Sequence, residues 1–137
     1  MEAVTVWDTK DAGSGHRTLS FDLVDILKLV EPELPGSEWQ LEKVVEAVGE
    51  ASRDFDRLCE TSEPIQGPEL LALASRVDQI VDGDFRGIRF GELWLRIRAI
   101  DSTEYVVITN DESILSRIRG RFSDVRESPE DARWYGA

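Results

Sequence analysis

The chain has 137 residues, 41% of them hydrophobic and 32% charged, which is the length and composition of one globular domain rather than of a disordered segment. Its formal net charge is −12, from 28 acidic and 16 basic residues. This excess of acid disfavours a protein that grips the phosphate backbone of nucleic acids, and it favours a cationic partner.

No apolar run approaches the roughly 18–20 residues that cross a bilayer. The N-terminus has no cationic segment ahead of a hydrophobic one, so we expect neither a membrane association nor a secretory signal. The single cysteine, Cys59, cannot form an internal disulfide, which fits a reducing compartment. The sequence therefore predicts a cytoplasmic protein with one domain, residues 1–137.

The chain begins with a short strand, a loop and a helix. Residues 4–7 have the character of a strand added to the edge of a sheet, and residues 10–17 that of a polar loop. Ser20 is the expected N-cap of a helix whose apolar stripe runs through residues 23–30 and which ends at Pro32.

A long amphipathic helix is predicted over residues 37–58. Ser37 and Gln40 have the spacing of a capping box, and apolar residues follow at helical spacing: Leu41, Val44, Val45, Val48, Ala51, Phe55 and Leu58. Gly49 weakens the middle by up to about 1 kcal/mol and leaves open whether the helix continues past it. The alternative is a strand over residues 39–45, whose alternation does not hold past Lys43.

Pro68 suits the first turn of a further helix, whose broad apolar face extends to Val81. Residues 82–111 then form three runs rich in aromatic and β-branched residues, with turn signals at 90–92 and 101–103. This pattern predicts a three-stranded antiparallel meander. In its middle strand one set of side chains faces the core (Leu93, Leu95, Ile97 and Ala99) and the other faces away (Trp94, Arg96, Arg98 and Ile100).

A last helix is expected to start at Thr109, which has Glu112 in capping-box spacing, and to end at about Gly120. Phe122 and Val125 are expected to pack beneath it. Residues 127–137 form a polar tail, with Trp134-Tyr135 as its apolar part, which we expect to be mobile. The predicted fold class is α+β: a three- to four-stranded antiparallel meander packed with about four helices in a single domain.

The residues that usually carry catalysis are sparse. His16 is the only histidine and lies in a glycine-containing loop that lacks the residues of a phosphate-binding motif. Cys59 has no nearby histidine and lies on the apolar side of a predicted helix, so a buried hydrophobic role is favoured. Carboxylate pairs are frequent in so acidic a chain and match no catalytic pattern. We therefore predict no enzyme, no cofactor and no metal site.

Two surfaces are candidates for binding a partner. The first is a row of carboxylates spaced by four residues, which a helix would present as one ridge: Glu38, Glu42, Glu46, Glu50 and Asp54. The plain alternative is a solvated face. The second is the far face of the meander, with Arg89, Trp94, Arg96 and Arg98. For this face, pairing of the arginines with the acidic helices of the same chain is favoured.

From residue 79 to residue 125 the chain resembles a known class of proteins. The resemblance lies in the order of four segments: QIVDGDF at 79–85, WLRIRAIDS at 94–102, ITNDE at 108–112 and RFSDV at 121–125. Small cytosolic bacterial immunity proteins of polymorphic-toxin and contact-dependent inhibition systems have a similar order. The resemblance covers the last third of the chain, and its motifs are structural. It implies an inhibitor that binds and blocks a cognate toxin domain.

The leading hypothesis from the sequence is a non-enzymatic immunity protein that binds a basic, nuclease-type toxin domain through its acidic surface. It would act as a monomer or small homo-oligomer, without nucleic acid. The alternatives are a structural or adaptor subunit of a larger bacterial complex, which would dock through Trp134-Tyr135 or the Trp/Arg face, and a small carboxylate-dependent enzyme.

Overall fold

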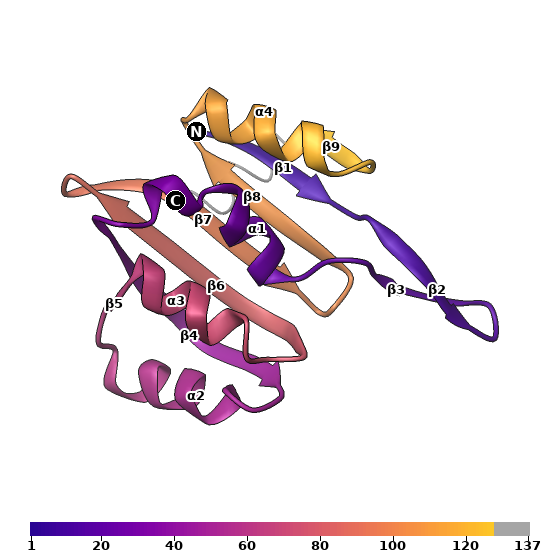
Figure 1. Cartoon of the computed structure of the whole chain (residues 1–137), viewed down its shortest axis with the longest axis horizontal. Coiled ribbons are helices and arrows are strands. Elements are labelled where there is room, and N and C mark those ends of the chain that lie inside the picture. The colour runs from indigo at the N-terminus through magenta and orange to yellow at the C-terminus, as the bar shows by residue number, and fades with distance from the viewer. Residues whose placement is uncertain (128–137) are drawn as a thin grey trace.

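A seven-stranded sheet, in which every pairing is antiparallel, organises the chain in the order β5-β4-β6-β7-β8-β1-β9. The computed structural model describes residues 1–127, apart from the side chains of residues 43 and 44. The predicted meander is confirmed as β6, β7 and β8. The predicted three to four strands are too few, because segments before and after the meander extend the sheet on both sides (Figure 1).

The strands of this sheet are β1 (Glu2–Val6), β4 (Ser37–Val48), β5 (Ile65–Gln66), β6 (Gln79–Arg89), β7 (Glu92–Ile100), β8 (Glu104–Thr109) and β9 (Val125–Glu127). A separate hairpin consists of β2 (Thr9–Gly13) and β3 (His16–Leu19). The helices are α1 (Leu23–Leu29), α2 (Ser52–Thr61), α3 (Gly67–Ala74) and α4 (Glu112–Arg121), with a short 3₁₀ helix η1 (Glu31–Glu33). The α+β class is therefore as predicted.

All four α-helices pack on one face of the sheet and form the main core with it (Figure 1). Leu27 of α1, Phe55 of α2, Leu70 of α3 and Ile118 of α4 are fully buried in one cluster with Ile97 of β7. We call this the helix side of the sheet. The opposite side, called here the outer face, carries a smaller buried cluster of Ala3, Val106 and Ile108.

The segment predicted as one long helix is a strand followed by a helix. Residues 37–48 form β4, and α2 begins only at Ser52, so the helix prediction for residues 37–51 is wrong. A spacing of four residues fits the period of two of a strand as well as the period of 3.6 of a helix. In β4, Trp39 enters the core with 0% exposure while its neighbours Glu38 and Gln40 are exposed.

Two glycines make this arrangement possible. The backbone of Gly49 has φ +126° and passes so close to the next segment that an added Cβ would lie 2.6 Å from the Asp78 nitrogen. Gly87 on β6 leaves room for the indole of Trp39, whose ring atoms would lie 2.7–2.9 Å from a Cβ there. The first glycine turns the chain at the end of β4, and the second fixes where its tryptophan sits.

Three smaller predictions also need correction. The helix that contains Pro68 ends at Ala74, and Ile80 and Val81 belong to β6. The N-cap of α1 is Asp22, in a capping box with Asp25, rather than Ser20. The N-cap of α4 is Asp111, whose carboxylate accepts the N–H of Ser113 at 2.9 Å, rather than Thr109. At both N-caps a carboxylate takes the capping position two residues beyond the predicted hydroxyl.

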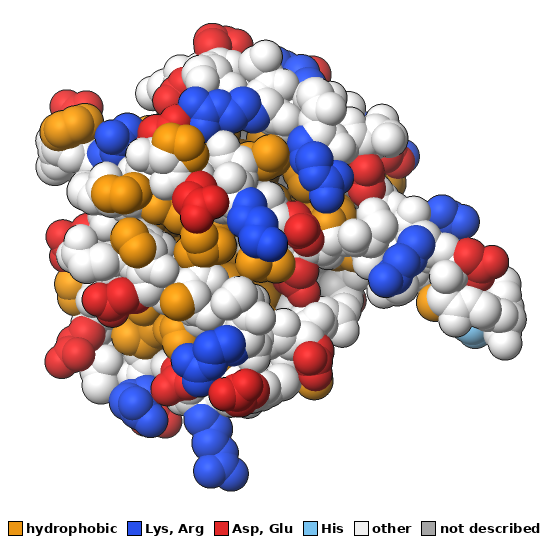
Figure 2. Space-filling model, viewed as in Figure 1, with side chains coloured by type: hydrophobic (Ala, Val, Ile, Leu, Met, Phe, Trp, Pro, Cys, Tyr) orange, Lys and Arg blue, Asp and Glu red, His pale blue; other side chains and the backbone are white. Residues whose placement is uncertain are grey.

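Residues 9–19, predicted as a loop up to Arg17, form the β2–β3 hairpin, which projects from the body as an arm (Figure 1). Every residue of β2 is exposed, and acidic and basic side chains are visible along the arm in Figure 2. Its turn contains Gly13, Ser14 and Gly15, all with positive φ. The glycines of this stretch therefore serve a tight reversal of the chain.

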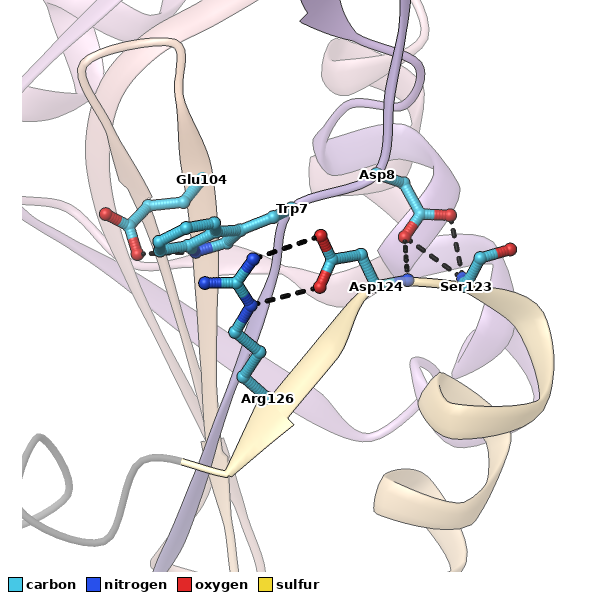
Figure 3. Close-up of polar contacts among 6 residues, drawn as sticks. All are labelled: Trp7, Asp8, Glu104, Ser123, Asp124 and Arg126. Atoms are coloured by element: carbon cyan, nitrogen blue, oxygen red, sulfur yellow. Dashed lines mark hydrogen bonds and ion pairs between the residues drawn. The ribbon is translucent and has the colours of Figure 1, made fainter.

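A cluster of polar contacts holds the base of the arm against β8 and β9 (Figure 3). The indole N–H of Trp7 donates to Glu104 at 3.0 Å, and the guanidinium of Arg126 lies 3.7 Å from the centre of the Trp7 ring. The Asp8 carboxylate accepts the backbone N–H groups of Ser123, at 2.8 Å, and Asp124, at 2.6 Å. The predicted packing of Phe122 is confirmed, since it is 5% exposed.

Candidate functional site

Parts of the two candidate surfaces predicted from the sequence meet on the outer face of the sheet. Glu42 of β4 lies opposite Asp84 of β6, which lies opposite Arg98 of β7. One step along the sheet, Gln40 lies opposite Arg86, and Arg86 opposite Arg96. Since residues paired across antiparallel strands point to the same side, the acidic strand and the arginine strand form one polar face.

The five carboxylates of the predicted ridge span three elements. Glu38, Glu42 and Glu46 lie on β4, Glu50 in the turn after it and Asp54 on α2. They do not form a helical ridge, but they follow one continuous segment.

Arginines approach only part of this row. Arg86 is 3.7 Å from Glu42, and Arg76 is 3.5 Å from both Glu50 and Asp54. These pairs are exposed, and such pairs contribute only about 0–1 kcal/mol each. Neither Glu38 nor Glu46 makes an ion pair with a described side chain, and both are exposed. The row keeps carboxylates that a partner's cations can reach.

Arg96 pairs within the chain, as favoured from the sequence, but with a neighbouring strand rather than with a helix. Its Nε and Nη2 donate to the two oxygens of Asp84 at 2.9 and 2.7 Å. Asp84 is 2% exposed, and the hydrogen bonds that Arg96 donates to this carboxylate raise the pKa of Arg96 above its ordinary value. Arg98, half-buried, lies beside the same carboxylate in register.

Arg89 and Trp94 lie on the other side of the sheet from Arg96 and Arg98. Gly87 pairs with Leu95 and Ile88 with Leu93, so Trp94 is the extra residue of a β-bulge. Its ring packs against the main core, 6.2 Å from the ring of Trp39. The bulge therefore breaks the predicted alternation of β7 at this residue and moves Leu93 to the outer face.

The arginine and tryptophan nevertheless contact each other. The guanidinium carbon of Arg89 is 5.1 Å from the ring centres of both Trp94 and Phe90. Phe90, predicted only as part of a turn, is 91% exposed. A phenylalanine before a glycine in a two-residue turn, where asparagine or aspartate is usual, is the signal that could have drawn attention to it.

The most constrained carboxylate lies elsewhere, under the N-terminus of α1. Asp22 accepts the N–H groups of Leu23 at 2.8 Å and Ile80 at 3.0 Å, and the hydroxyl of Tyr105. Burial raises the pKa of Asp22 above its ordinary value, against the hydrogen bond from Tyr105, which lowers it. Burial and the nearby Asp22 carboxylate raise the pKa of Tyr105 well above its ordinary value. Both oxygens of Asp22 are engaged, which fits a structural junction.

The remaining candidates from the sequence are separated from one another. His16 lies exposed at the tip of the arm. Cys59 of α2, predicted to be buried, is half-buried against the main core, and its sulfur accepts the N–H of Val45 at 3.3 Å. Within residues 1–127, no group of three or more His, Cys, Asp or Glu side chains is arranged to hold a metal ion.

Trp134 and Tyr135, together with residues 128–137 of the predicted mobile tail, lie outside the described residues. No helix in the described part of the chain combines the length and apolar character needed to cross a membrane. Comparison of the sequence with protein-family models and with curated proteins, and of the structure with solved structures, finds no match.

Proposed function

We propose that the protein is a non-enzymatic binding protein of the immunity type, which blocks a basic, nuclease-type toxin domain through the carboxylates that follow β4, the turn after it and α2. The observation that supports this most directly is that Glu38 and Glu46 are exposed on the outer face and make no ion pair with a described side chain. Unpaired carboxylates on a rigid strand attract a cationic surface and lose little freedom when they pair with it.

The surroundings of this row support a protein partner. The arginines near it, Arg76 and Arg86, form only long, exposed contacts with its carboxylates, and these can be exchanged for contacts to a partner. On the helix side, shown in Figure 2, acidic and basic side chains are interspersed. A formal net charge of −12 would accelerate association with a basic protein at low ionic strength.

The first test identifies the partner and measures how fast it binds. The tagged full-length protein would be used to isolate its partner from the source cell, and association with the purified partner would be followed over a range of salt concentrations. We expect a basic protein whose association rate falls steeply as salt is added, because screening weakens attraction between opposite charges. An acidic partner, or a rate unaffected by salt, contradicts the proposal.

The second test locates the surface. Reversal of Glu38, Glu42 and Glu46 to lysine should slow association by at least about tenfold, since these charges steer the encounter. The matched control reverses three exposed acids outside the row, Glu31, Glu60 and Glu112, and so makes the same change in net charge. If both variants slow association equally, the effect comes from net charge and the row is not the contact surface.

A further inference from the structure

The turn between β6 and β7 exposes a large aromatic side chain in an unfavourable backbone conformation. Phe90 has φ 53° and Gly91 φ 76°, which are the left-handed conformations of a tight hairpin turn. Bulky residues rarely adopt this conformation. Phe90 is nevertheless 91% exposed, so the chain gains no core packing from it. Exposure and strain together indicate that the side chain has a use outside the isolated molecule.

The same turn carries one unpaired charge of each sign. Arg89 and Glu92 face each other in the strand register, yet they form no ion pair, because the Arg89 guanidinium is stacked on the rings of Phe90 and Trp94. Neither side chain makes an ion pair with another described side chain. The pKa of Glu33 is lowered chiefly by its hydrogen bond to Arg117, and the positive charge of Arg89 adds to this effect from a greater distance. A matching surface must therefore offer a carboxylate and a cation side by side.

A pocket of about 320 Å³ lies next to these residues, lined by Arg89, Phe90, Glu92, Leu93, Trp94 and the start of the β8–α4 connection. A cavity of about 150 Å³ can hold a benzene molecule, so this pocket has room for a phenyl ring. The indole N–H of Trp94, one of the lining residues, is buried and makes no hydrogen bond to the described residues. The turn thus presents both an aromatic side chain and a cavity that fits one.

We propose that this turn is a self-association site and that its occupant is a second copy of the same chain. In a two-fold symmetric pair, Phe90 of each copy enters the pocket of the other, and Arg89 of each copy pairs with Glu92 of the other. The patch is self-complementary in shape and in charge, which is what a two-fold interface requires. Figure 1 shows this turn at the opposite end of the molecule from the β2–β3 arm, so a second copy here leaves the arm accessible.

The contact is small, and each copy carries a formal net charge of −12, so we expect a weak pair with a Kd on the order of 0.1 mM at physiological salt. It does not depend on the proposed function, because none of its residues belongs to the acidic row. Loss of self-association would leave binding of a basic partner intact, and reversal of the acidic row would leave self-association intact.

Sedimentation equilibrium of the full chain over a wide concentration range tests the proposal. The parent should show a monomer–dimer equilibrium, and Phe90→Asn should weaken it by at least about tenfold, as expected for the loss of a buried aromatic anchor. Asparagine is favoured at this turn position, so the variant should fold at least as well as the parent. A parent that stays monomeric at all concentrations, or a dimer unaffected by Phe90→Asn, overturns the proposal.

Exchange of the two charges tests the symmetry. Arg89→Glu alone places like charges opposite each other in the pair, and Glu92→Arg alone does the same, so each variant should be monomeric. A mixture of the two variants restores both opposite-charge contacts and should form mixed dimers at about the parental strength. If the mixture remains monomeric, the two charges do not pair across a two-fold interface and the proposal fails.

Discussion

Asp22 connects three parts of the chain that are far apart in the sequence: the start of α1, the start of β6 through Ile80, and β8 through Tyr105. Each donor would be left without a partner in a low-dielectric region if the carboxylate were lost. The same burial raises the pKa of Asp22, while the Tyr105 hydroxyl opposes that change. The fold therefore depends on the charged form of Asp22, although burial in the same fold disfavours that form.

Replacement of Tyr105 with phenylalanine removes the hydrogen bond to Asp22 and leaves the burial of Asp22 in place, so it separates the two effects on this carboxylate. We expect the free energy of unfolding to fall by about 1–3 kcal/mol, because the Asp22 carboxylate loses a hydrogen bond while it stays buried. We also expect the pKa of Asp22 to rise further, since the lost hydrogen bond lowers it. Urea unfolding and an NMR titration of the side-chain carboxyl carbons measure the two quantities.

Whether stability rises or falls with pH follows from the raised pKa of Asp22. The pKa of Asp22 in the folded protein lies above its ordinary value, so its contribution to stability decreases as pH rises from the ordinary pKa through the folded-state pKa. In Tyr105→Phe this decrease extends to higher pH, so the destabilisation should grow across that window. The pKa of Glu33, lowered by its hydrogen bond to Arg117, should not change and is the internal control. A pH-independent destabilisation with an unchanged Asp22 pKa contradicts the account.

At the scale of the elements, the junction between β4 and α2 depends on one backbone conformation. Gly49 has φ +126°, and a Cβ there would lie 2.6 Å from the Asp78 nitrogen and 3.0 Å from the Val77 Cα. Gly49→Ala should therefore lower the free energy of unfolding by about 1–3 kcal/mol, measured by urea unfolding.

Gly120 in α4 supplies the matched control for this substitution. A Cβ there meets no atom within 4 Å, and alanine is favoured over glycine in helices, so Gly120→Ala should be neutral or stabilising by up to about 1 kcal/mol. If Gly49→Ala is as harmless as the control, the tight approach of β4 to residues 77–78 is not a constraint on the fold.

The meander could be predicted from the sequence because its signals are local. The turns at Phe90-Gly91 and Asp101-Ser102 bound strands rich in β-branched and aromatic residues. All three strands form, although β6 begins at Gln79, before the predicted start at residue 82. Strand β4 could not be assigned in the same way, because its carboxylates repeat every four residues and this spacing suits both a helix and a strand. The burial of Trp39 depends on Gly87, which lies 48 positions further along the chain.

The residues of the candidate surfaces could be predicted from the sequence, but their positions relative to one another could not. The sequence indicated both the acidic row and the arginines of β7, yet only the register Glu42–Asp84–Arg98 shows that they share one face. The bulge at Trp94 separates residues that were predicted to share a face, since it places Trp94 and Arg89 on the helix side, away from Arg96. Register shifts depend on long-range pairing, which no local pattern contains.

At the scale of the whole molecule, the β2–β3 arm stands apart from the body that carries the core. All of β2 is exposed, and a two-stranded hairpin alone contributes little stability in water. The ends of the arm are already close, since the N–H of Ser20 donates to the Asp8 carbonyl at 3.1 Å and Thr9 pairs with Leu19. The body should therefore fold without the arm.

Replacement of residues 10–18 by Asn-Gly would join Thr9 to Leu19 through a two-residue turn. We expect the free energy of unfolding, measured by urea titration, to change by less than about 0.5 kcal/mol, because the deleted side chains lie mainly at the surface. Asp8→Ala is the contrasting variant. It keeps the arm but leaves the N–H groups of Ser123 and Asp124 without their acceptor, at an expected cost of about 1–3 kcal/mol. If removal of the arm lowers the free energy of unfolding more than Asp8→Ala does, the hairpin is part of the folded body. In that case the contacts of Asp8 are not the main interaction that holds β1 against β9.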